Sequence, residues 1–528
     1  MSAAATKPEP PGVPGRWWAA GCGVLAGALT VAVAELLAAV LLRAGRAGGT
    51  PSPVLALGGA FVDRTPAWLK DAAVAAFGVK DKAVLLLGIA VVVLALSAAA
   101  GLLAARVRMV GLPLVAGLAT VAVAAVLSRP GARGFDAAPT LAGAVTGLLS
   151  LSTLLDRWQR CREPHEPPWR VALRRRSFLL ALGATGALAA VAGAGSQVVG
   201  RAARVARASR EALRLPEPTG VRLPGAALVS ERVPGISPLL TPVPDFYRID
   251  TALSVPQLSA AGWRLRVHGL VERELRLDLD ELLAAGLVER MVTLSCVSNE
   301  VGGDLVGNQR WLGHPLRDLL ARAGPRAGAD MVLSTSADGW TAGTPLAALT
   351  DPGRDALLAV GMGGEPLTVE HGFPVRMVVP GLYGYVSATK WVVDLEVTRF
   401  DRAQGYWTPR GWSALGPVKT ASRIDVPRAG ARLAAGRVAV AGVAWAPHRD
   451  VRAVQVRVDE GPWRTARLGT GGTADSWRQW VLEWDATPGP HRLQVRAVDG
   501  QGDAQTAAQA PPAPDGASGW HTVEVTVR

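Results

Sequence analysis

Five long apolar runs in the first 200 residues constrain this chain more than any other feature. They cover residues 17–42, 83–105, 109–128, 137–155 and 177–199, are rich in Ala, Leu, Val and Gly, and carry almost no charge. A helix needs about 20 mostly apolar residues to cross a bilayer. Core helices of a soluble domain would show an amphipathic period, and these runs show little of one. Residues 1–200 are therefore predicted to form an all-α transmembrane bundle.

The distribution of charge divides the chain at the same place. Residues 1–210 hold 23 Lys and Arg against 9 Asp and Glu, a balance of +14 that accounts for the net charge of +13 of the whole chain. Residues 211–528 hold 33 against 34. A nucleic-acid-binding domain needs clustered Lys and Arg on its folded surface. We therefore expect no nucleic acid among the partners.

Arginines between the runs predict the orientation of the bundle. Arg106 and Arg108 stand in the second link, and seven arginines crowd the segment from Arg157 to Arg176. Positively charged links stay in the cytoplasm. Although the loop 129–136 has two arginines of its own, the pattern predicts a multi-pass protein of the cell membrane. Everything after about residue 200 is expected on the extracytoplasmic side.

The start of the fifth run also resembles an export signal. The stretch Arg175-Arg176-Ser177-Phe178-Leu179 is similar to a twin-arginine signal, although it is internal. Such signals are addresses that a receptor reads. The resemblance implies that the following domain crosses the membrane folded, commonly because it carries a cofactor. The alternative is an ordinary positive flank of a membrane helix, and cleavage of the fifth helix stays open.

Two further features of the first part can be interpreted. Residues 61–78 contain four charged residues and are predicted to form a surface or interfacial helix. Glu35 is the one carboxylate inside the apolar runs. Because a carboxylate in lipid is costly, Glu35 is a candidate functional group.

The second part divides into a linker and two domains. Residues 201–245 are rich in Arg, Pro and Gly and are predicted to be a linker. Residues 246–420 alternate strand-like and helical stretches, which indicates an α+β domain. Residues 421–528 show strict alternation, as in VRAVQVRV, with turn signals between the runs. This pattern predicts a β-sandwich in which Trp480, Leu482 and Trp484 face the core.

The stretch that carries chemistry is TLSCVSNEVGGDLVGNQRWLGHPLRDLL, residues 293–320. Cys296 stands at the end of a strand-like run, ahead of a polar, glycine-rich loop. A thiolate at such a place is a soft ligand for a transition metal. Without further context, a lone cysteine would be read as a buried structural thiol.

This stretch resembles the sulfite oxidase family of molybdenum–molybdopterin enzymes. The motifs that carry the resemblance occur in the family's order: FYRIDTAL (246–253), TLSCVSN (293–299), WLGHPLRDLLARAG (311–324), HGFPVRMVVPG (371–381) and KWV (390–392). The part after residue 420 resembles the family's immunoglobulin-like dimerisation domain, so a homodimer is an open expectation. The five apolar runs do not belong to the general family pattern.

The resemblance implies a role for individual residues. Cys296 matches the cysteine that binds molybdenum and is the predicted catalytic and metal-binding residue. Arg248 matches an arginine near the cofactor and is the second predicted catalytic residue. Molybdopterin is expected to be held by Cys296, Asn299, His371, Arg376 and Lys390. Arginine and lysine suit the dianionic phosphate of the pterin.

One departure from the family bears on the substrate. After the cysteine, sulfite oxidases proper carry an arginine pair that neutralises sulfite, and here Glu300 and Val301 stand in that place. An oxyanion would lose a charged partner there. The substrate-side tyrosine of the family has no clear counterpart, and only Tyr406 and Trp407 lie nearby in the sequence.

The sequence thus predicts a membrane-anchored oxidoreductase that transfers an oxygen atom to or from a small substrate. Two alternatives stay open: a sulfoxide or N-oxide reductase of the same family, and a membrane-anchored binding protein without cofactor. All seven histidines lie outside the apolar runs, and a haem held by two histidines in the bundle would need them inside. We therefore expect no haem, and a separate electron carrier, a quinone or a cytochrome.

Overall fold

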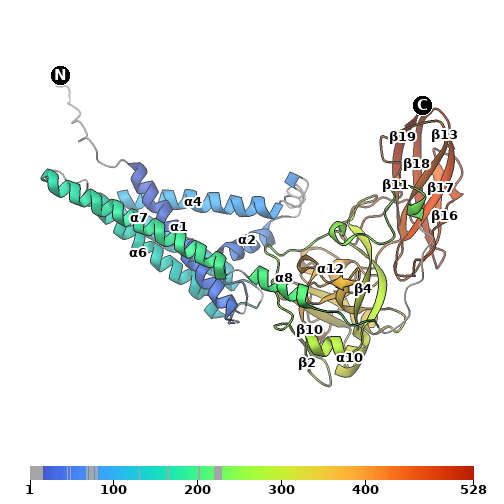
Figure 1. The fold of residues 1–528 in the computed structure, drawn as a ribbon, viewed down its shortest axis with the longest axis horizontal. Coiled ribbons are helices and arrows are strands. Elements are labelled where there is room, and N and C mark those ends of the chain that lie inside the picture. Colours follow the sequence, from blue (N-terminus) through green and yellow to red (C-terminus); the bar gives the residue numbers. More distant parts are fainter. Residues whose placement is uncertain are drawn as a thin grey trace. The chain divides into compact units, whose positions relative to one another are not determined.

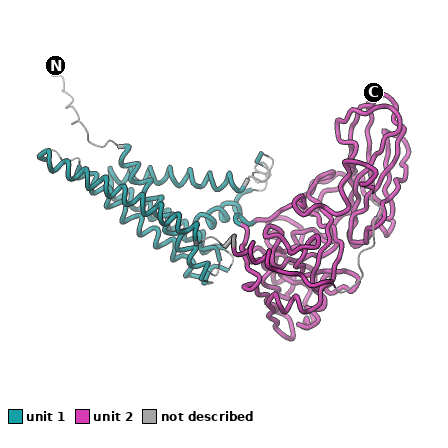
Figure 2. The backbone as a smooth tube through the Cα atoms, viewed as in Figure 1, with its two compact units in different colours: residues 1–203, 252–254 teal, residues 204–251, 255–528 magenta. Residues whose placement is uncertain are grey.

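A computed structural model describes residues 16–44, 46–47, 49–66, 69, 76–77, 81–129, 131–161, 163, 166–199, 202–218 and 229–528. The chain forms two compact units (Figure 2). Unit 1 holds residues 1–203 and 252–254, and unit 2 holds residues 204–251 and 255–528. Each unit is described by itself.

Unit 1 is a helical bundle. Five of its helices are long and apolar enough to cross a membrane: α1 (Arg16–Arg43), α4 (Asp81–Arg106), α5 (Arg108–Leu127), α6 (Ala138–Arg160) and α7 (Pro168–Val199). These helices contain the five predicted runs except for residues 128 and 137, and α7 begins nine residues before the fifth run because it takes in the arginines. Residues 61–64, the start of the predicted interfacial helix, form the end of the short helix α2 (Pro53–Arg64). Most of residues 67–80 lie outside the described residues.

Helix α1 packs against α4, α6 and α7 (Figure 1). Glycines permit the close approach. A Cβ on Gly101 of α4 would lie 2.3 Å from the carbonyl oxygen of Ala19, and a Cβ on Gly147 of α6 would lie 1.8 Å from Oγ1 of Thr30. Small residues at helix contacts are typical of membrane bundles, since lipid provides no hydrophobic force between helices.

The two basic links lie at the same end of this bundle. Arg108, at the start of α5, forms an ion pair with Asp156 near the end of α6 and donates to Oε1 of Gln159 at 3.1 Å. Arg157 donates to the carbonyl oxygen of Ser177 on α7 at 2.9 Å. The links α4–α5 and α6–α7 are therefore neighbours, as the positive-inside prediction requires.

Glu35 has a structural partner near the other end of α1. Its Oε1 accepts hydrogen bonds from Oγ of Ser52 at 2.8 Å and from the N–H of Val54 at 3.2 Å. These groups belong to the start of helix α2, whose first N–H groups have no partner within the helix. The carboxylate therefore completes the cap of α2.

The first domain of unit 2 contains two sheets. One has the order β2-β1-β10-β5-β6, and the other has the order β3-β4-β7-β8 with β9 paired to β7. Their strands are β1 (Arg264–Gly269), β2 (Leu275–Asp278), β3 (Val288–Ser295), β4 (Val306–Pro315), β5 (Met331–Ser336), β6 (Thr341–Pro345), β7 (Leu357–Met362), β8 (Glu365–Pro366), β9 (Arg376–Val378) and β10 (Val392–Thr398).

Helices cover and connect these sheets. They are α8 (Ala202–Ala212), α9 (Leu279–Ala284), α10 (Leu316–Ala323), α11 (Leu346–Thr350) and α12 (Gly384–Ser387), with short 3₁₀ turns at Val229–Glu231, Val243–Asp245, Val369–His371 and Thr408–Arg410. Helix α9 begins with a capping box, in which Asp278 and Glu281 each accept the other's backbone N–H. The start of the predicted linker is helical, and Leu213 and Leu215 just after α8 pack against the core of this domain.

The second domain of unit 2 contains two further sheets. Their orders are β11-β13-β17-β16 and β12-β19-β18-β14-β15. The strands are β11 (Ala421–Val426), β12 (Arg432–Leu433), β13 (Gly436–Trp445), β14 (Val451–Val458), β15 (Arg464–Thr465), β16 (Arg467–Leu468), β17 (Arg478–Ala486), β18 (Gly489–Asp499) and β19 (His521–Val527). Trp480, Leu482 and Trp484 are buried in one core with residues of both sheets, as the alternation predicts.

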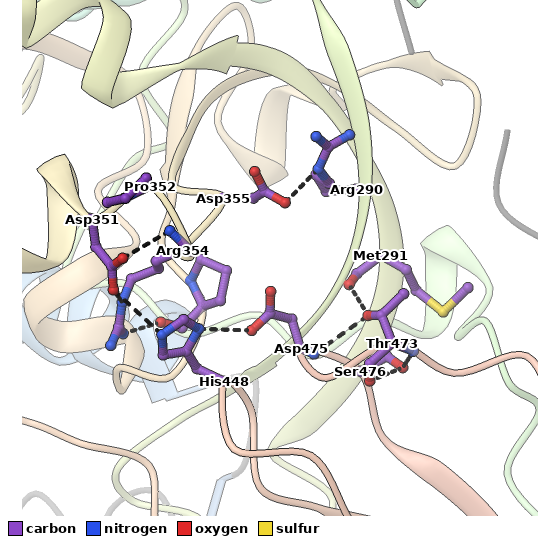
Figure 3. A network of polar contacts seen from close by, with 12 residues as sticks. Arg290, Met291, Asp351, Pro352, Arg354, Asp355, His448, Thr473, Asp475 and Ser476 are labelled. Carbon is purple, nitrogen blue, oxygen red and sulfur yellow. Dashed lines mark hydrogen bonds and ion pairs between the residues drawn. The ribbon is translucent and has the colours of Figure 1, made fainter. Parts of the chain in front are cut away.

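Polar contacts join the two domains of unit 2 beside strand β3 (Figure 3). The N–H of Thr293 donates to the carbonyl oxygen of Asp475 at 2.9 Å, and Oγ1 of Thr473 donates to that of Met291 at 3.2 Å. His448 stands between two carboxylates, with Asp351 and Asp475 each 3.5 Å from a ring nitrogen. The β-rich domain therefore braces the strand that ends directly before Cys296.

Candidate active site

Cys296 follows the last residue of β3. Its N–H donates to the carbonyl oxygen of Leu305 at 2.9 Å, and its own carbonyl oxygen accepts from the N–H of Asn299 at 3.1 Å. The turn is therefore closed on both sides of the cysteine. Burial raises the pKa of the thiol. A thiolate here needs a metal ion or nearby cations to stabilise it.

The thiol lies at a cavity of about 150 Å³. Five segments of unit 2 form its walls: residues 246–251, 296–298, 336–340, 371–391 and 407–412. Because these segments belong to both sheets of the first domain and to the loops between them, only the folded domain creates the cavity.

Buried basic residues gather on one side. Arg376 is 5% exposed, and its guanidinium donates to the carbonyl oxygens of His371 at 3.2 Å and Ala388 at 3.4 Å. Its Cζ atom also lies 5.0 Å from the centre of the Trp311 ring. Burial lowers the pKa of Arg376 to about 10, so it is charged at neutral pH.

Lys390 and His371 complete this basic side. The Nζ atom of Lys390 donates to Oδ2 of Asp250 at 2.7 Å, and that oxygen also accepts from Nε of Arg248 at 3.1 Å. Burial lowers the pKa of Lys390 to about 8, against the opposing effect of Asp250. Burial, with Arg376 and Lys390 nearby, lowers the pKa of His371 to about 4. The imidazole is therefore neutral at pH 7, whereas the lysine is largely protonated.

Aromatic side chains form the remaining wall. Tyr385 and Trp412 have ring centres 5.9 Å apart, and Trp407 and Trp412 have theirs 6.3 Å apart. Tyr247 also lines the cavity, and burial together with the Cys296 thiol raises its pKa. The phenol of Tyr247 therefore keeps its proton and is a potential donor to a group at the cysteine.

Two buried polar atoms on this cavity have no hydrogen-bond partner within the described part of the chain. They are Oγ of Ser336 and Nε1 of Trp340. An unpaired buried polar atom costs about 1–3 kcal/mol. Such atoms fit a site that receives a polar ligand. With the thiol and the buried cations, they match the donors that a molybdenum ion and a pterin phosphate need.

The structure brings together five of the six predicted site residues. Cys296, Arg248, His371, Arg376 and Lys390 all line the cavity. Asn299 does not. Its Oδ1 accepts from the N–H of Leu305 at 2.9 Å, and the residue lines a second, smaller cavity toward the β-rich domain. Its observed role is to hold the loop that follows the cysteine.

Glu300 and Val301 line the second cavity and are not among the wall residues of the Cys296 cavity, because the turn after Cys296 carries them away from it. The expectation about the substrate that was drawn from them stays a prediction. Trp407 does line the Cys296 cavity, whereas Tyr406 is not among its wall residues.

Sequence reasoning missed several residues of the site. Tyr247 and Asp250 flank the predicted Arg248 in the FYRID motif, and their position next to it was an available signal. Ser336, Trp340 and Trp412 come from a hairpin and a loop far along the chain. No motif marks these three, so only the fold identifies them.

The part of the chain that holds this cavity is similar to known proteins. The family model of the oxidoreductase molybdopterin binding domain matches residues 252–407. The sulfite oxidase of Gallus gallus is 30% identical over 338 residues, which cover 54% of this chain and 71% of that protein. The mitochondrial sulfite oxidase of Homo sapiens is 31% identical over 322 residues, 52% of this chain and 58% of the human protein.

Among solved structures, the sulfane dehydrogenase SoxCD from Paracoccus pantotrophus is similar, with 25% identity and a TM-score of 0.46. The match covers 54% of this chain and 80% of that one. The chain belongs to the sulfite oxidase family of molybdopterin oxidoreductases. It spans 58% of the length of the mammalian relatives, and its first 200 residues lie entirely outside the matched family model.

Proposed function

We propose that this protein is a membrane-anchored molybdenum–molybdopterin oxidoreductase that moves an oxygen atom to or from a small substrate, with its catalytic domain on the extracytoplasmic side. The observation that carries the proposal is the Cys296 thiol at a cavity walled on one side by Arg376, Lys390 and His371. Buried cations of this kind are costly unless an anion joins them.

Each residue would have a defined task toward the cofactor. Cys296 would provide the thiolate for molybdenum. Arg376 and Lys390 would hold the pterin phosphate, and the neutral ring of His371 would hydrogen-bond the pterin. The hydroxyl of Ser336, which has no hydrogen-bond partner among the described residues, would gain one. When bound, the cofactor supplies the two-electron redox chemistry and the exchangeable oxygen.

The chain itself would contribute orientation and a proton. Tyr247 keeps its phenolic proton and lines the cavity with Cys296, so it would donate a hydrogen bond to the oxygen that is transferred. Arg248 is held by Asp250 and faces the same space, where it would orient the polar end of the substrate. The aromatic wall would exclude water from the reacting atoms.

The membrane part supports the proposed location. Both basic links lie at one end of the bundle, and with an odd number of spans unit 2 would lie on the side opposite the N-terminus. The twin-arginine stretch at Arg175 and Arg176 fits export of a folded, cofactor-loaded domain. The β-rich domain would be the family's immunoglobulin-like module that pairs two copies. A quinone or a cytochrome would exchange electrons with the site.

Metal and pterin analysis of the purified full-length protein tests the proposal. We expect close to one molybdenum and one pterin per chain from a molybdenum-competent host. The Arg376→Ala variant should lose most of both, because it removes a buried cation from the phosphate. The matched variant Arg437→Ala, at an exposed ion pair of the β-rich domain, should keep both. If the wild-type protein contains neither molybdenum nor pterin, the result would favour the alternative of a binding protein without cofactor.

A sulfoxide or N-oxide reductase is a second candidate. The aromatic wall favours it, since Tyr385, Trp407 and Trp412 offer apolar contact rather than charge to a substrate. Assays with a reduced dye and an S-oxide or N-oxide, beside assays with sulfite and an electron acceptor, decide between the two directions.

A further inference from the structure

The β-rich domain contacts the chain on both sides of Cys296. Before the cysteine, loop 473–477 bonds to Thr293, which lies three residues upstream on β3. Directly after the cysteine, Val297 packs in an apolar cluster that includes residues of the β-rich domain. At the far end of the following loop, Arg423 of β11 bonds to the backbone of Gly303. The cysteine therefore stands between points that the second domain holds.

The contact at Thr293 uses both its backbone and its hydroxyl. Its N–H donates to the carbonyl oxygen of Asp475 at 2.9 Å, and its Oγ1 accepts from the N–H of Trp477 at 2.7 Å. The same hydroxyl donates to Oδ1 of Asn308 on β4 at 3.0 Å. One side chain therefore joins β3, β4 and the β-rich domain.

This junction is buried, and its polar atoms are paired. Thr293, Asn308 and Trp477 are 1%, 0% and 2% exposed. Nδ2 of Asn308 and Nε1 of Trp477 both donate to the carbonyl oxygen of Leu239 at 2.8 Å. A buried network whose members all have partners makes its surroundings rigid. The end of β3 is therefore held in one position relative to the β-rich domain.

Charged side chains hold loop 473–477 against the first domain (Figure 3). Nδ1 of His448 lies 3.5 Å from Oδ1 of Asp475, and its Nε2 lies 3.5 Å from Oδ2 of Asp351 in the first domain. Oγ1 of Thr473 donates to the carbonyl oxygen of Met291 on β3. The loop that contacts Thr293 is thus itself fixed to the domain that carries the cysteine.

The loop after the cysteine is held in a second way. Val297 is buried with Trp445 and Trp477 of the β-rich domain. Nη1 of Arg423 donates to the carbonyl oxygen of Gly303 at 2.7 Å. A loop that is fixed at both of its ends leaves the residue between them few directions in which its side chain can point.

We propose that the β-rich domain sets the position of the Cys296 thiol, and that Thr293 and Arg423 are the positioning residues through which it does so. Neither of these two is among the wall residues of the cavity, so both would act through the backbone. Groups behind a metal ligand commonly orient it in this way. The inference rests on the proposed function for the ligand role of the thiol. It gives the β-rich domain a task besides the expected pairing of two copies.

Alkylation of Cys296 in pterin-free, full-length protein tests the position of the thiol without the metal. Thr293→Val keeps the shape of the side chain and removes its hydroxyl, whereas Thr293→Ser keeps the hydroxyl. By mass spectrometry, we expect Cys296 to react at least about tenfold faster in Thr293→Val than in wild type, because a loosened turn exposes the thiol. Thr293→Ser should react at the wild-type rate.

A second pair of variants tests the other end of the loop. Arg423→Met removes the bond to Gly303 and should also speed the alkylation of Cys296. The matched control Arg437→Met, at an exposed ion pair of the same domain, should leave the rate unchanged. A wild-type rate in both Thr293→Val and Arg423→Met would overturn the proposal.

Low concentrations of urea separate positioning from a general loss of stability. Local opening depends little on urea, whereas global unfolding grows with its concentration. Fast alkylation of Thr293→Val that is insensitive to urea below the unfolding transition supports positioning. A rate that rises with urea as steeply as unfolding does would show a purely structural role and overturn the proposal.

Molybdenum-loaded protein separates this inference from the proposed function. There, Thr293→Val should lower kcat about tenfold at unchanged KM, because the metal ligand and not the substrate pocket is displaced. If the wild-type protein holds no molybdenum but the variants alkylate faster, the proposed function fails and the positioning stands. If the wild-type protein holds molybdenum but neither alkylation nor kcat changes in the variants, the positioning alone fails.

Discussion

Nζ of Lys390 lies 2.7 Å from Oδ2 of Asp250, although 140 residues separate the two in the chain. The side chains are 10% and 6% exposed, so this is a buried ion pair. Arg248 shares the same carboxylate. Asp250 therefore balances two cations at the site that we propose for the pterin phosphate, and its charge opposes the effect of burial on the pKa of Lys390.

The first prediction concerns Lys390. Because its pKa is lowered to about 8, the free amine should form as the pH rises through 8. In pterin-free protein, acetylation of Lys390 measured by mass spectrometry should therefore rise with a midpoint near pH 8. A midpoint well above pH 8 would contradict the prediction.

The second prediction concerns the thiol. Cys296→Ser should lower the turnover of the loaded enzyme at least about a hundredfold, because a hydroxyl is a poor substitute for a soft thiolate. The unfolding temperature should change little, since the hydroxyl fits the same turn. The control Cys161→Ser, in unit 1, should keep full turnover. Full activity in Cys296→Ser would show that the thiol of Cys296 is not the metal ligand.

The third prediction is a pH dependence of stability. Burial, with Arg423 nearby, lowers the pKa of His521, and its Nδ1 accepts the N–H of Ile424 at 3.0 Å. Below about pH 6.5 the unfolded chain binds a proton that the folded chain refuses, so the free energy of unfolding should fall as the pH falls.

Urea unfolding of wild type and His521→Gln between pH 7.5 and 5.5 measures this effect. The variant should lose part of the pH slope, since its side chain does not titrate. The same slope in both proteins would show that other groups cause it.

The fourth prediction assigns Glu35 to structure. Glu35→Leu should lower the stability of the bundle in detergent by about 1–3 kcal/mol, because Ser52 and Val54 lose their acceptor. Glu35→Gln keeps an acceptor and should lose less. Molybdenum content should be the same in both variants. A loss of turnover in Glu35→Gln at unchanged stability would instead indicate a functional carboxylate.

The fifth prediction concerns export. Replacing Arg175 and Arg176 by lysine should leave unit 2 in the cytoplasm, because a twin-arginine receptor reads the pair itself. Protease accessibility of unit 2 in spheroplasts measures the outcome. The matched change of Arg106 and Arg108 to lysine keeps the positive charge of another link and should not alter export. If unit 2 of this variant is still exported, Arg175 and Arg176 are only an ordinary positive flank of a membrane helix.

The features that depend on local order could be predicted from the residues alone. A run of 20 apolar residues is long enough to span a membrane wherever it stands, and alternation predicts which side of a strand is buried. The position of Cys296 at a strand end, and that of His371 and Arg376 in one motif, follow from neighbouring residues as well. For this reason five helices, the core tryptophans of the β-rich domain and most of the basic side of the cavity were predictable.

Only the tertiary structure decided the rest. Contacts between segments far apart in the chain create three further features. They are the pairing of Asp250 with Lys390, the aromatic wall, and the position of the Ser336 hydroxyl on the cavity. The turn after Cys296 shows the same limit, since sequence position suggested that Glu300 faces the substrate and the backbone carries it to another cavity. Sequence order gives distance along the chain, whereas a site is defined by directions in space that packing alone sets.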